Sequence, residues 1–248
     1  MKLFQYTGVQ VRDGRVREIR DDIAIEERFS LYLNDRFLTT QVASPECLRE
    51  LGAGFVVCEG LADEVHGVDV SGNEIRVYAP SAGAIALEVE SSGGYRVARE
   101  PAPVRSAIRV RPDDIFRITA GIESESWRKT GGVHCSVLYN GDRRVARICD
   151  VGRHNTVDKV VGHAVLNGID RSACILGCTG RQPAGMVAKI AHAGIPIVIS
   201  RAASSDQGIM TAVRTGVTLI CFSRDGRFTV YAHPERVEGI SPDTKQGT

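Results

Sequence analysis

The chain has no long run of apolar residues. Nothing in its 248 residues approaches the roughly 20 consecutive apolar side chains that a membrane-spanning helix needs. The N-terminal segment Met1–Tyr6 precedes no apolar stretch, and charges appear from Arg12 onward, so we recognise no secretory signal. The sequence therefore predicts a cytoplasmic protein that has no membrane partner.

The chain also lacks an excess of charge of either sign. Its 31 basic and 30 acidic residues leave a formal net charge of +1. Proteins that bind nucleic acid or membrane surfaces generally carry a strongly basic field. The balance argues against both classes of partner, although a local basic patch is still allowed. The length suits one large domain, or a large one with a small one.

Common metal-ligand motifs are missing as well. The seven cysteines include no CxxC pair, and the chain contains no HExxH, which are spacings typical of zinc sites. Cys174 and Cys178 are four residues apart, but they fall where a strand is expected to run into a turn. We therefore predict no bound metal. An odd number of cysteines without an export signal predicts reduced thiols, most of them buried as small apolar side chains.

Two patterns divide the chain. Residues 1–111 contain alternating segments typical of half-buried strands, such as Phe29–Asn34 and Glu74–Ala79, with one helix expected to have Ser44 as its N-cap. Residues 112–248 alternate apolar strands with helices, which predicts a sheet covered on both faces. The predicted fold class is α/β, with a smaller β-rich N-terminal domain and a C-terminal α/β/α sandwich.

In the second domain, the pattern predicts a hairpin followed by the clearest helix. The hairpin runs from His134 to Cys149 around Asn140-Gly141, the pair that a type I′ turn favours. The helix is expected to begin at Asn155 as N-cap and to bury a face of valines. A later helix is expected to have Ser204 as its N-cap.

The densest polar cluster lies where the hairpin ends and the valine-rich helix begins. Its polar members are Asp150, Arg153, His154, Asn155, Asp158 and Lys159. Strand ends and helix N-termini often form ligand sites, because free N–H groups there attract phosphate, and an arginine can add a bidentate contact. The alternative is a capped helix with surface ion pairs. So many polar side chains in one turn favour a ligand site.

A second cluster begins with Gly131 and Gly132 and continues to His134 and Cys135. The glycines let the backbone approach a ligand closely. Cys135 is the thiol most expected to react, if any does. His134 should point to the opposite face of the strand, so the basic side chains of the first cluster, His154 among them, are better placed to lower the pKa of Cys135. A buried and inert Cys135 is an equally open interpretation.

Two further turns follow strands in the second domain. One contains Gly180 and Arg181, and the next contains Arg201 and Ser204. Together they could form a shelf for phosphate, although each alone resembles an ordinary strand–helix turn. A last polar turn comprises Phe222, Ser223, Arg224, Asp225, Gly226 and Arg227. Taken alone, this turn is best interpreted as the solvated tip of a hairpin.

These clusters, in this order, resemble the formate dehydrogenase accessory sulfurtransferases, the FdhD family. The matching blocks are Thr130–His134, Asp150–Asn155 with Asp158-Lys159, Ala193–Pro196, Tyr231–Arg236, Glu26–Asn34, Leu51-Gly52 and Glu59–Leu61. They extend over nearly the whole chain.

The resemblance implies a function that spacing alone could not indicate. The second domain would be similar to the cytidine deaminase fold. The protein would pass sulfur from a cysteine desulfurase to a bis-molybdopterin guanine dinucleotide cofactor, before the cofactor enters apo-formate dehydrogenase. Phe222 to Arg227 would bind this cargo, guanine nucleotides would mimic it, and a homodimer is possible.

The sequence departs from the family at one point. Many members have a CxxC pair after a serine-rich strand end, and its first cysteine carries a persulfide. Here the corresponding segment is Ser91-Ser92-Gly93-Gly94, without cysteine. Two hypotheses follow: either Cys135 carries the sulfur, or the protein is a cofactor-binding chaperone without a covalent step. A zinc deaminase would need H-x-E and P-C-x-x-C, and the sequence contains neither.

Overall fold

The computed structural model describes residues 1–80, 87–90, 94–97 and 100–240. Its strands are β1 (Leu3–Arg12), β2 (Arg15–Ala24), β3 (Glu27–Leu33), β4 (Arg36–Ala43), β5 (Gly67–Ser71), β6 (Glu74–Tyr78), β7 (Leu87–Glu90), β8 (Gly94–Val97), β9 (His134–Asn140), β10 (Arg143–Asp150), β11 (Cys174–Cys178), β12 (Ile197–Ser200), β13 (Thr218–Arg224) and β14 (Arg227–Ala232). Its α-helices are α1 (Leu48–Cys58), α2 (Pro112–Ile122), α3 (Glu125–Thr130), α4 (Arg153–Leu166), α5 (Ala184–His192) and α6 (Asp206–Thr215). Of the segment that corresponds to the family's CxxC pair, residues 91–94, the first three residues lie outside the described residues. No helix in these ranges is both long enough and apolar enough to cross a bilayer.

A mixed six-stranded sheet forms the centre of the second half of the chain. Its strand order is β10-β9-β11-β12-β13-β14. Strands β11, β12 and β13 are parallel, and β9, β10 and β14 run antiparallel to their neighbours. The predicted α/β class is confirmed. The likeness to cytidine deaminases stays a prediction.

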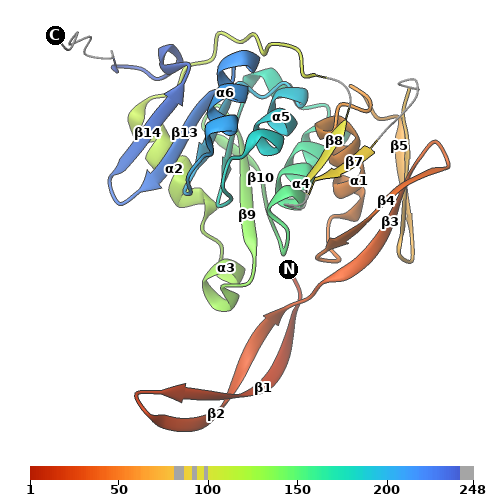
Figure 1. Cartoon of the computed structure of the whole chain (residues 1–248), viewed down its shortest axis with the longest axis vertical. Helices are drawn as coiled ribbons and strands as arrows, with labels where there is room; N and C mark the ends of the chain where they lie inside the picture. The colour runs from red at the N-terminus through yellow and green to blue at the C-terminus, as the bar shows by residue number, and fades with distance from the viewer. Residues whose placement is uncertain (81–86, 91–93, 98–99, 241–248) are drawn as a thin grey trace.

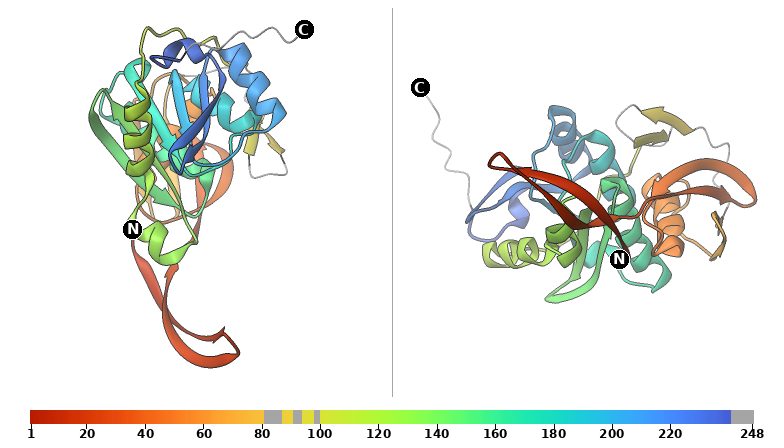
Figure 2. Two further views of the ribbon diagram at one scale, coloured as in Figure 1. Left: turned by 90° about the vertical axis from the view of Figure 1, so that its left-hand side faces the viewer. Right: turned by 90° about the horizontal axis from the view of Figure 1, so that it is seen from below.

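Helices cover both faces of this sheet. Successive side chains of a strand point to opposite faces, so Ile175 of β11 packs in one core and Leu176 in the other. The first core contains Ile115 and Ile118 of α2. The second contains Val160 of α4 together with residues of α5 and α6. Figures 1 and 2 show α2 on one side of the sheet and α4, α5 and α6 on the other.

The N-terminal part forms a smaller sheet of order β4-β3-β6-β5, packed on α1. A hairpin turn at Gly72-Asn73 joins β5 to β6. Helix α1 also packs on α4, which joins the two parts. The N-cap of α1 is Cys47 and not Ser44. The Ser44 hydroxyl instead accepts a hydrogen bond from Val151 N–H at 3.3 Å. The boundary between residues 111 and 112 stays a prediction.

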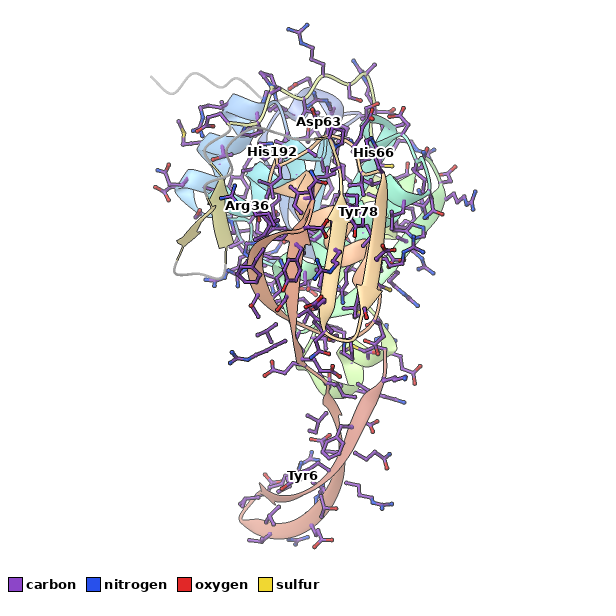
Figure 3. The ribbon with its side chains drawn as sticks, turned by 90° about the vertical axis from the view of Figure 1, so that its right-hand side faces the viewer. Tyr6, Arg36, Asp63, His66, Tyr78 and His192 are labelled. Atoms are coloured by element: carbon purple, nitrogen blue, oxygen red, sulfur yellow. A yellow bond between two sulfur atoms is a disulfide. The ribbon has the colours of Figure 1, made fainter. Side chains whose placement is uncertain are left out.

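Strands β1 and β2 form an arm that projects from the body (Figures 1 and 2). They pair from Leu3 with Ala24 to Arg12 with Arg15. Tyr6, labelled on the arm in Figure 3, is 60% exposed. The arm touches the body near α3, and its residues line neither of the two hollows described below.

Candidate functional site

A hollow of about 480 Å³ lies at the carboxyl ends of the parallel strands. It is lined by Trp127, Gly131, Gly132, Val133, His134, Val151, Thr179, Arg201, Ala202 and Arg224, and we call it the arginine hollow. Crevices at the carboxyl ends of strands are the usual ligand sites of open α/β sheets. The hollow brings together the Gly-Gly cluster, one strand-end arginine and the late polar turn.

The turn before β9 positions His134 in this hollow. Gly131 has φ of +59° and ends α3, a left-handed conformation that favours glycine. His134 then begins β9, and its Nδ1 lies 3.0 Å from the hydroxyl of Thr179, which follows β11. Burial and the charge of Arg153 lower the pKa of His134. The ring is therefore a neutral hydrogen-bonding group at pH 7.

The two arginines of the hollow differ in their partners. Arg201 forms a 2.7 Å ion pair with Glu123 and lies over the ring of Trp127 at 5.6 Å. Arg224 forms a longer, 3.9 Å ion pair with the exposed Asp225. Arginine binds phosphate oxygens through its fork of donors. The arrangement therefore suits a ligand that carries phosphates and a planar ring.

A second hollow, of about 370 Å³, adjoins the first and shares His134 and Val151 with it. Its other lining residues are Thr40, Gln41, Val42, Phe55, Gly152, Arg153, His154, Asn155, Asp158 and Lys189, and we call it the histidine hollow. Strand β4 and helix α1 of the N-terminal part form one wall, and the start of α4 forms the other. The Gly-Gly turn and the late polar turn therefore border one hollow, and the start of α4 borders the hollow beside it.

His154 is the unusual group of the histidine hollow. Its side chain is buried, and neither ring nitrogen has a hydrogen-bond partner among the described residues. Burial, followed by the charges of Lys189 and Arg153, lowers the pKa of His154 to about 3. The Oε1 of Gln41 is likewise buried without a partner among the described residues. Because unmet buried polar groups are costly, both groups suit a polar ligand.

His154 should make the fold sensitive to acid. Its pKa of about 3 in the folded chain lies below the roughly 6.5 expected in the unfolded chain. The unfolded state therefore takes up the proton first, and stability present above about pH 6.5 is lost as the pH falls towards 3. Between about pH 6.5 and 4.5 we expect the wild type to lose about 2 kcal/mol more than His154→Gln. Urea unfolding across this range measures the difference, and equal losses would contradict the assignment.

Several residues of the first polar cluster turn away from the hollows. Helix α4 begins after Gly152, so Asn155 is not its N-cap. The amide of Asn155 donates at 2.8 Å both to Val42 O and to Asp150 Oδ1. Lys159 is fully buried and pairs with Asp150 at 2.6 Å. The expectation that Lys159 contacts the cargo is wrong, because the buried carboxylate of Asp150 holds its ammonium.

Asp158 is also held by a buried partner. It lines the histidine hollow, but its carboxylate accepts bonds from Lys189 at 2.8 and 3.0 Å, and Lys189 also pairs with Glu59 of the N-terminal part at 2.6 Å. Asp158 therefore serves to join α4 to α5 and α1.

The predicted phosphate shelf is formed only in part. Arg201 lines the arginine hollow, whereas Arg181 is exposed outside it. The carbonyl of Gly180 accepts bonds from Gln182 and Ser200. Ser204 is not an N-cap, because its hydroxyl donates to the carbonyl of Gln182. The N-cap of α6 is the next residue, Ser205, which accepts from Gly208 N–H.

Only one residue of the late polar turn lines the arginine hollow, and that is Arg224. Phe222 has φ of +52° and packs against the core, and the Ser223 hydroxyl is buried against Thr119. The other three residues, Asp225, Gly226 and Arg227, are exposed at the hairpin tip. The interpretation of this turn as a solvated hairpin tip therefore holds for Asp225, Gly226 and Arg227.

Cys135 is neither exposed nor a free thiol. It is fully buried and forms a disulfide with Cys149, directly opposite on β10. The expectation that all seven cysteines are reduced is wrong for this pair. Cys135 belongs to the core that contains Ile118 of α2, on the face of the sheet opposite His154. The basic side chains at the start of α4 therefore do not act on its sulfur.

Cys149 is the residue that the sequence analysis missed. Strand β9 pairs Asn140 with Arg143, and the register shifts by one between Arg144 and Ala146. Without this bulge, counting cross-strand pairs outward from the turn would place Ile148 opposite Cys135. One signal was available in the sequence: Cys135 and Cys149 lie at similar distances on either side of a Gly-containing turn. The turn itself is formed by Gly141-Asp142, one residue later than expected, and only Gly141 has a positive φ.

Comparisons with known proteins agree on one family. The model of the FdhD/NarQ family matches residues 24–238. The sulfur carrier protein FdhD of Methanothermobacter thermautotrophicus is 36% identical over 243 residues, which cover 92% of this chain and 96% of that protein. The sulfur carrier protein FdhD of Wolinella succinogenes is 31% identical and covers 96% of this chain, which in turn spans 90% of that protein.

A solved structure is similar over nearly the whole chain. It is a crystal structure, from Desulfotalea psychrophila, of a protein described as a formate dehydrogenase accessory protein. The TM-score is 0.82 at 31% identity, covering 96% of this chain and all of the other. Its likeness extends beyond the sandwich to the N-terminal part, as the family match does. This chain belongs to the FdhD/NarQ family.

Proposed function

We propose that this protein serves the maturation of formate dehydrogenase, as a sulfurtransferase that holds a bis-molybdopterin guanine dinucleotide cofactor and passes sulfur to it. The names of the relatives, sulfur carrier protein FdhD, support the sulfur-carrier role. The observation that carries the proposal is the arginine hollow, in which Arg201, Arg224 and the Gly131-Gly132 turn meet at the carboxyl ends of parallel strands. The cofactor is cargo here, so each step below concerns the chain's own residues.

The guanine nucleotide end of the cargo fits the arginine hollow. Arg201 and Arg224 would bind its phosphates through charge-assisted hydrogen bonds. Trp127, already under the guanidinium of Arg201, offers an aromatic face for a planar base. The neutral His134 and the Thr179 hydroxyl would orient the end that points towards the histidine hollow. We further propose a cysteine desulfurase as sulfur donor and apo-formate dehydrogenase as recipient, with a homodimer and a cytoplasmic location as predictions from the sequence.

Loss of Arg224 should weaken guanine nucleotide binding. Isothermal titration calorimetry with GDP compares the wild type with Arg224→Ala. We expect the Kd to rise at least about tenfold, because a hydrogen bond to a charged group contributes about 1.5–3 kcal/mol and 1.4 kcal/mol is tenfold. Arg214→Ala is the matched control, since Arg214 is exposed on α6 and lies outside the hollow. Equal loss in both variants, or no GDP binding by the wild type, would reject the site.

A chaperone without a covalent step is the second candidate function. It is favoured by the burial of Cys135, whose sulfur lies in the core beside α2 and not in either hollow. This function predicts that Cys135→Ser still binds GDP and still supports activation of formate dehydrogenase. Loss of activation in a variant that folds and binds GDP normally would rule it out.

A further inference from the structure

Cys135 and Cys149 form a pair that the backbone holds face to face. Their Cα atoms are 4.2 Å apart, the spacing of a non-hydrogen-bonded antiparallel pair. Cys135 N–H donates to the Thr179 hydroxyl, and its carbonyl accepts from Thr179 N–H, so its backbone groups point towards β11. Nothing in the ladder between β9 and β10 therefore has to change when the two sulfurs bond or separate.

The two sulfurs differ in access to solvent. Cys135 is fully buried, whereas Cys149 is half-buried on β10, the edge strand of the sheet. Both lie near Ser124, whose Oγ is 3.0 Å from each sulfur. This oxygen accepts bonds from Trp127 N–H and from the Cys149 thiol, and its hydroxyl is close enough to donate to either sulfur once that sulfur is a thiolate. A hydroxyl donor stabilises a thiolate over a thiol.

The remaining cysteines lack these features. Four of them are buried, and burial raises the pKa of Cys174 and of Cys178 to about 11. Cys47 is exposed as a residue, but the partial burial of its sulfur and the nearby Glu50 raise the pKa of its thiol. It lies just before α1 and is paired with no other cysteine. Since all seven cysteines lie in the described residues, the pair on β9 and β10 stands apart as the one built for exchange.

We propose that Cys149 accepts sulfane sulfur from a persulfide and that Cys135 releases it as sulfide; this role rests on the proposed function. In the first step the Cys149 thiolate attacks the outer sulfur of a donor R–S–SH, giving Cys149–S–SH and the thiolate R–S⁻. In the second, the Cys135 thiolate attacks the Cys149 sulfur. The bond to the outer sulfur breaks, leaving the Cys135–Cys149 disulfide and HS⁻.

The cycle closes by reduction. A dithiol reductant gives two electrons and two protons to the disulfide, restores both thiols and becomes a disulfide itself. The paired state in the structure is thus the end of one turnover. Trp127 lines the arginine hollow and, like Cys149, packs against the core that contains Cys135, so one side chain borders both that core and the proposed cargo site. The route needs no cysteine at residues 91–94.

The test uses the full chain, reduced with a dithiol that is then removed, and glutathione persulfide as donor. Sulfide is trapped with monobromobimane, and thiol states are read by alkylation and peptide mass spectrometry. The wild type should release one equivalent of sulfide per chain and gain the Cys135–Cys149 disulfide. Cys135→Ser should keep one added sulfur on Cys149 and release none. Cys149→Ser should do neither, and Cys47→Ser should behave as the wild type.

These measurements distinguish the proposed roles of Cys135 and Cys149. An added sulfur on Cys135 in Cys149→Ser, or full sulfide release by Cys135→Ser, would overturn them, as would a wild type that forms no disulfide. Cys135→Ala provides a second variant should serine disturb the buried site. GDP binding is measured on the same samples. If GDP binding persists without sulfide release, this inference fails and the proposed cofactor-binding role stands; if release occurs without GDP binding, the proposed cofactor-binding role fails.

Discussion

Replacing Asp150 by alanine is expected to destabilise the fold by about 3–5 kcal/mol, because it leaves the buried ammonium of Lys159 without its counter-charge. The two side chains are fully buried and 2.6 Å apart. Asp150 also accepts hydrogen bonds from the backbone N–H groups of Ser44 and Gly152 and from the side chain of Asn155. One carboxylate therefore joins the N-terminal part to the start of α4, where the candidate site lies. Chemical denaturation gives the free energy of unfolding.

Two controls separate the buried charge from general damage. Asp142→Ala removes an 87% exposed carboxylate that pairs with Arg117 at 3.0 Å, and a surface pair contributes about 1 kcal/mol or less. The double variant Asp150→Ala with Lys159→Met removes both buried charges, so it should be more stable than Asp150→Ala alone. A double variant that is as unstable as the sum of its parts would show that the ion pair is not the cause.

The order of elements in the second domain was predictable because it depends on local patterns. Strands such as β11 and β12 are continuous apolar runs, and α5 follows a helical period. The convergence of Arg201 and Arg224 follows from a general property of parallel sheets, whose strands end at one edge. Gly131 reaches the same edge because it precedes β9, which runs antiparallel to β11. These parts of the site required no knowledge of side-chain partners.

The inward polar residues of α4 were not predictable from the sequence. Their partners are far away in the chain: Lys159 bonds the carbonyl of Ser44, and Asp158 holds Lys189. From the sequence alone, lysine and aspartate are expected to be solvated or to bind a ligand, since unpaired charges are rarely buried. Only the packing of α4 against β10 and α5 shows that these charges are paired inside. The partner of the Ser44 hydroxyl, Val151, is likewise 107 residues away in the chain.

The cysteine pair was missed for a different physical reason. A bulge is one inserted residue, and it moves every later cross-strand partner by one position. Here it places Cys149, and not Ile148, opposite Cys135. The turn also lies one residue later than Asn140-Gly141. The sequence therefore did not indicate that Cys149 faces Cys135, because both the position of the turn and the bulge shift the register.

The second large effect concerns the glycines where α1 crosses α4. A Cβ on Gly54 would overlap the carbonyl oxygen of Asp158, and one on Gly162 would overlap the carbonyl oxygen of Glu50. Because each obstacle is backbone, the helices must separate, so we expect Gly54→Ala or Gly162→Ala to cost about 3 kcal/mol or more. Gly185→Ala on α5 meets no atom within 4 Å and should be stabilising by about 0.5–1 kcal/mol.

Separation of α1 from α4 should also disturb the candidate site, because Arg153 and His154 lie in the first turn of α4. Moving α4 away from α1 displaces these residues from Phe55, with which they line the histidine hollow. The arginine hollow shares His134 and Val151 with it, so GDP affinity should fall in any Gly162→Ala protein that still folds. Thermal unfolding and GDP titration on the three glycine variants measure both effects. Gly162→Ala and Gly185→Ala proteins of equal stability and equal GDP affinity would show that close contact between the two helices does not hold the site in place.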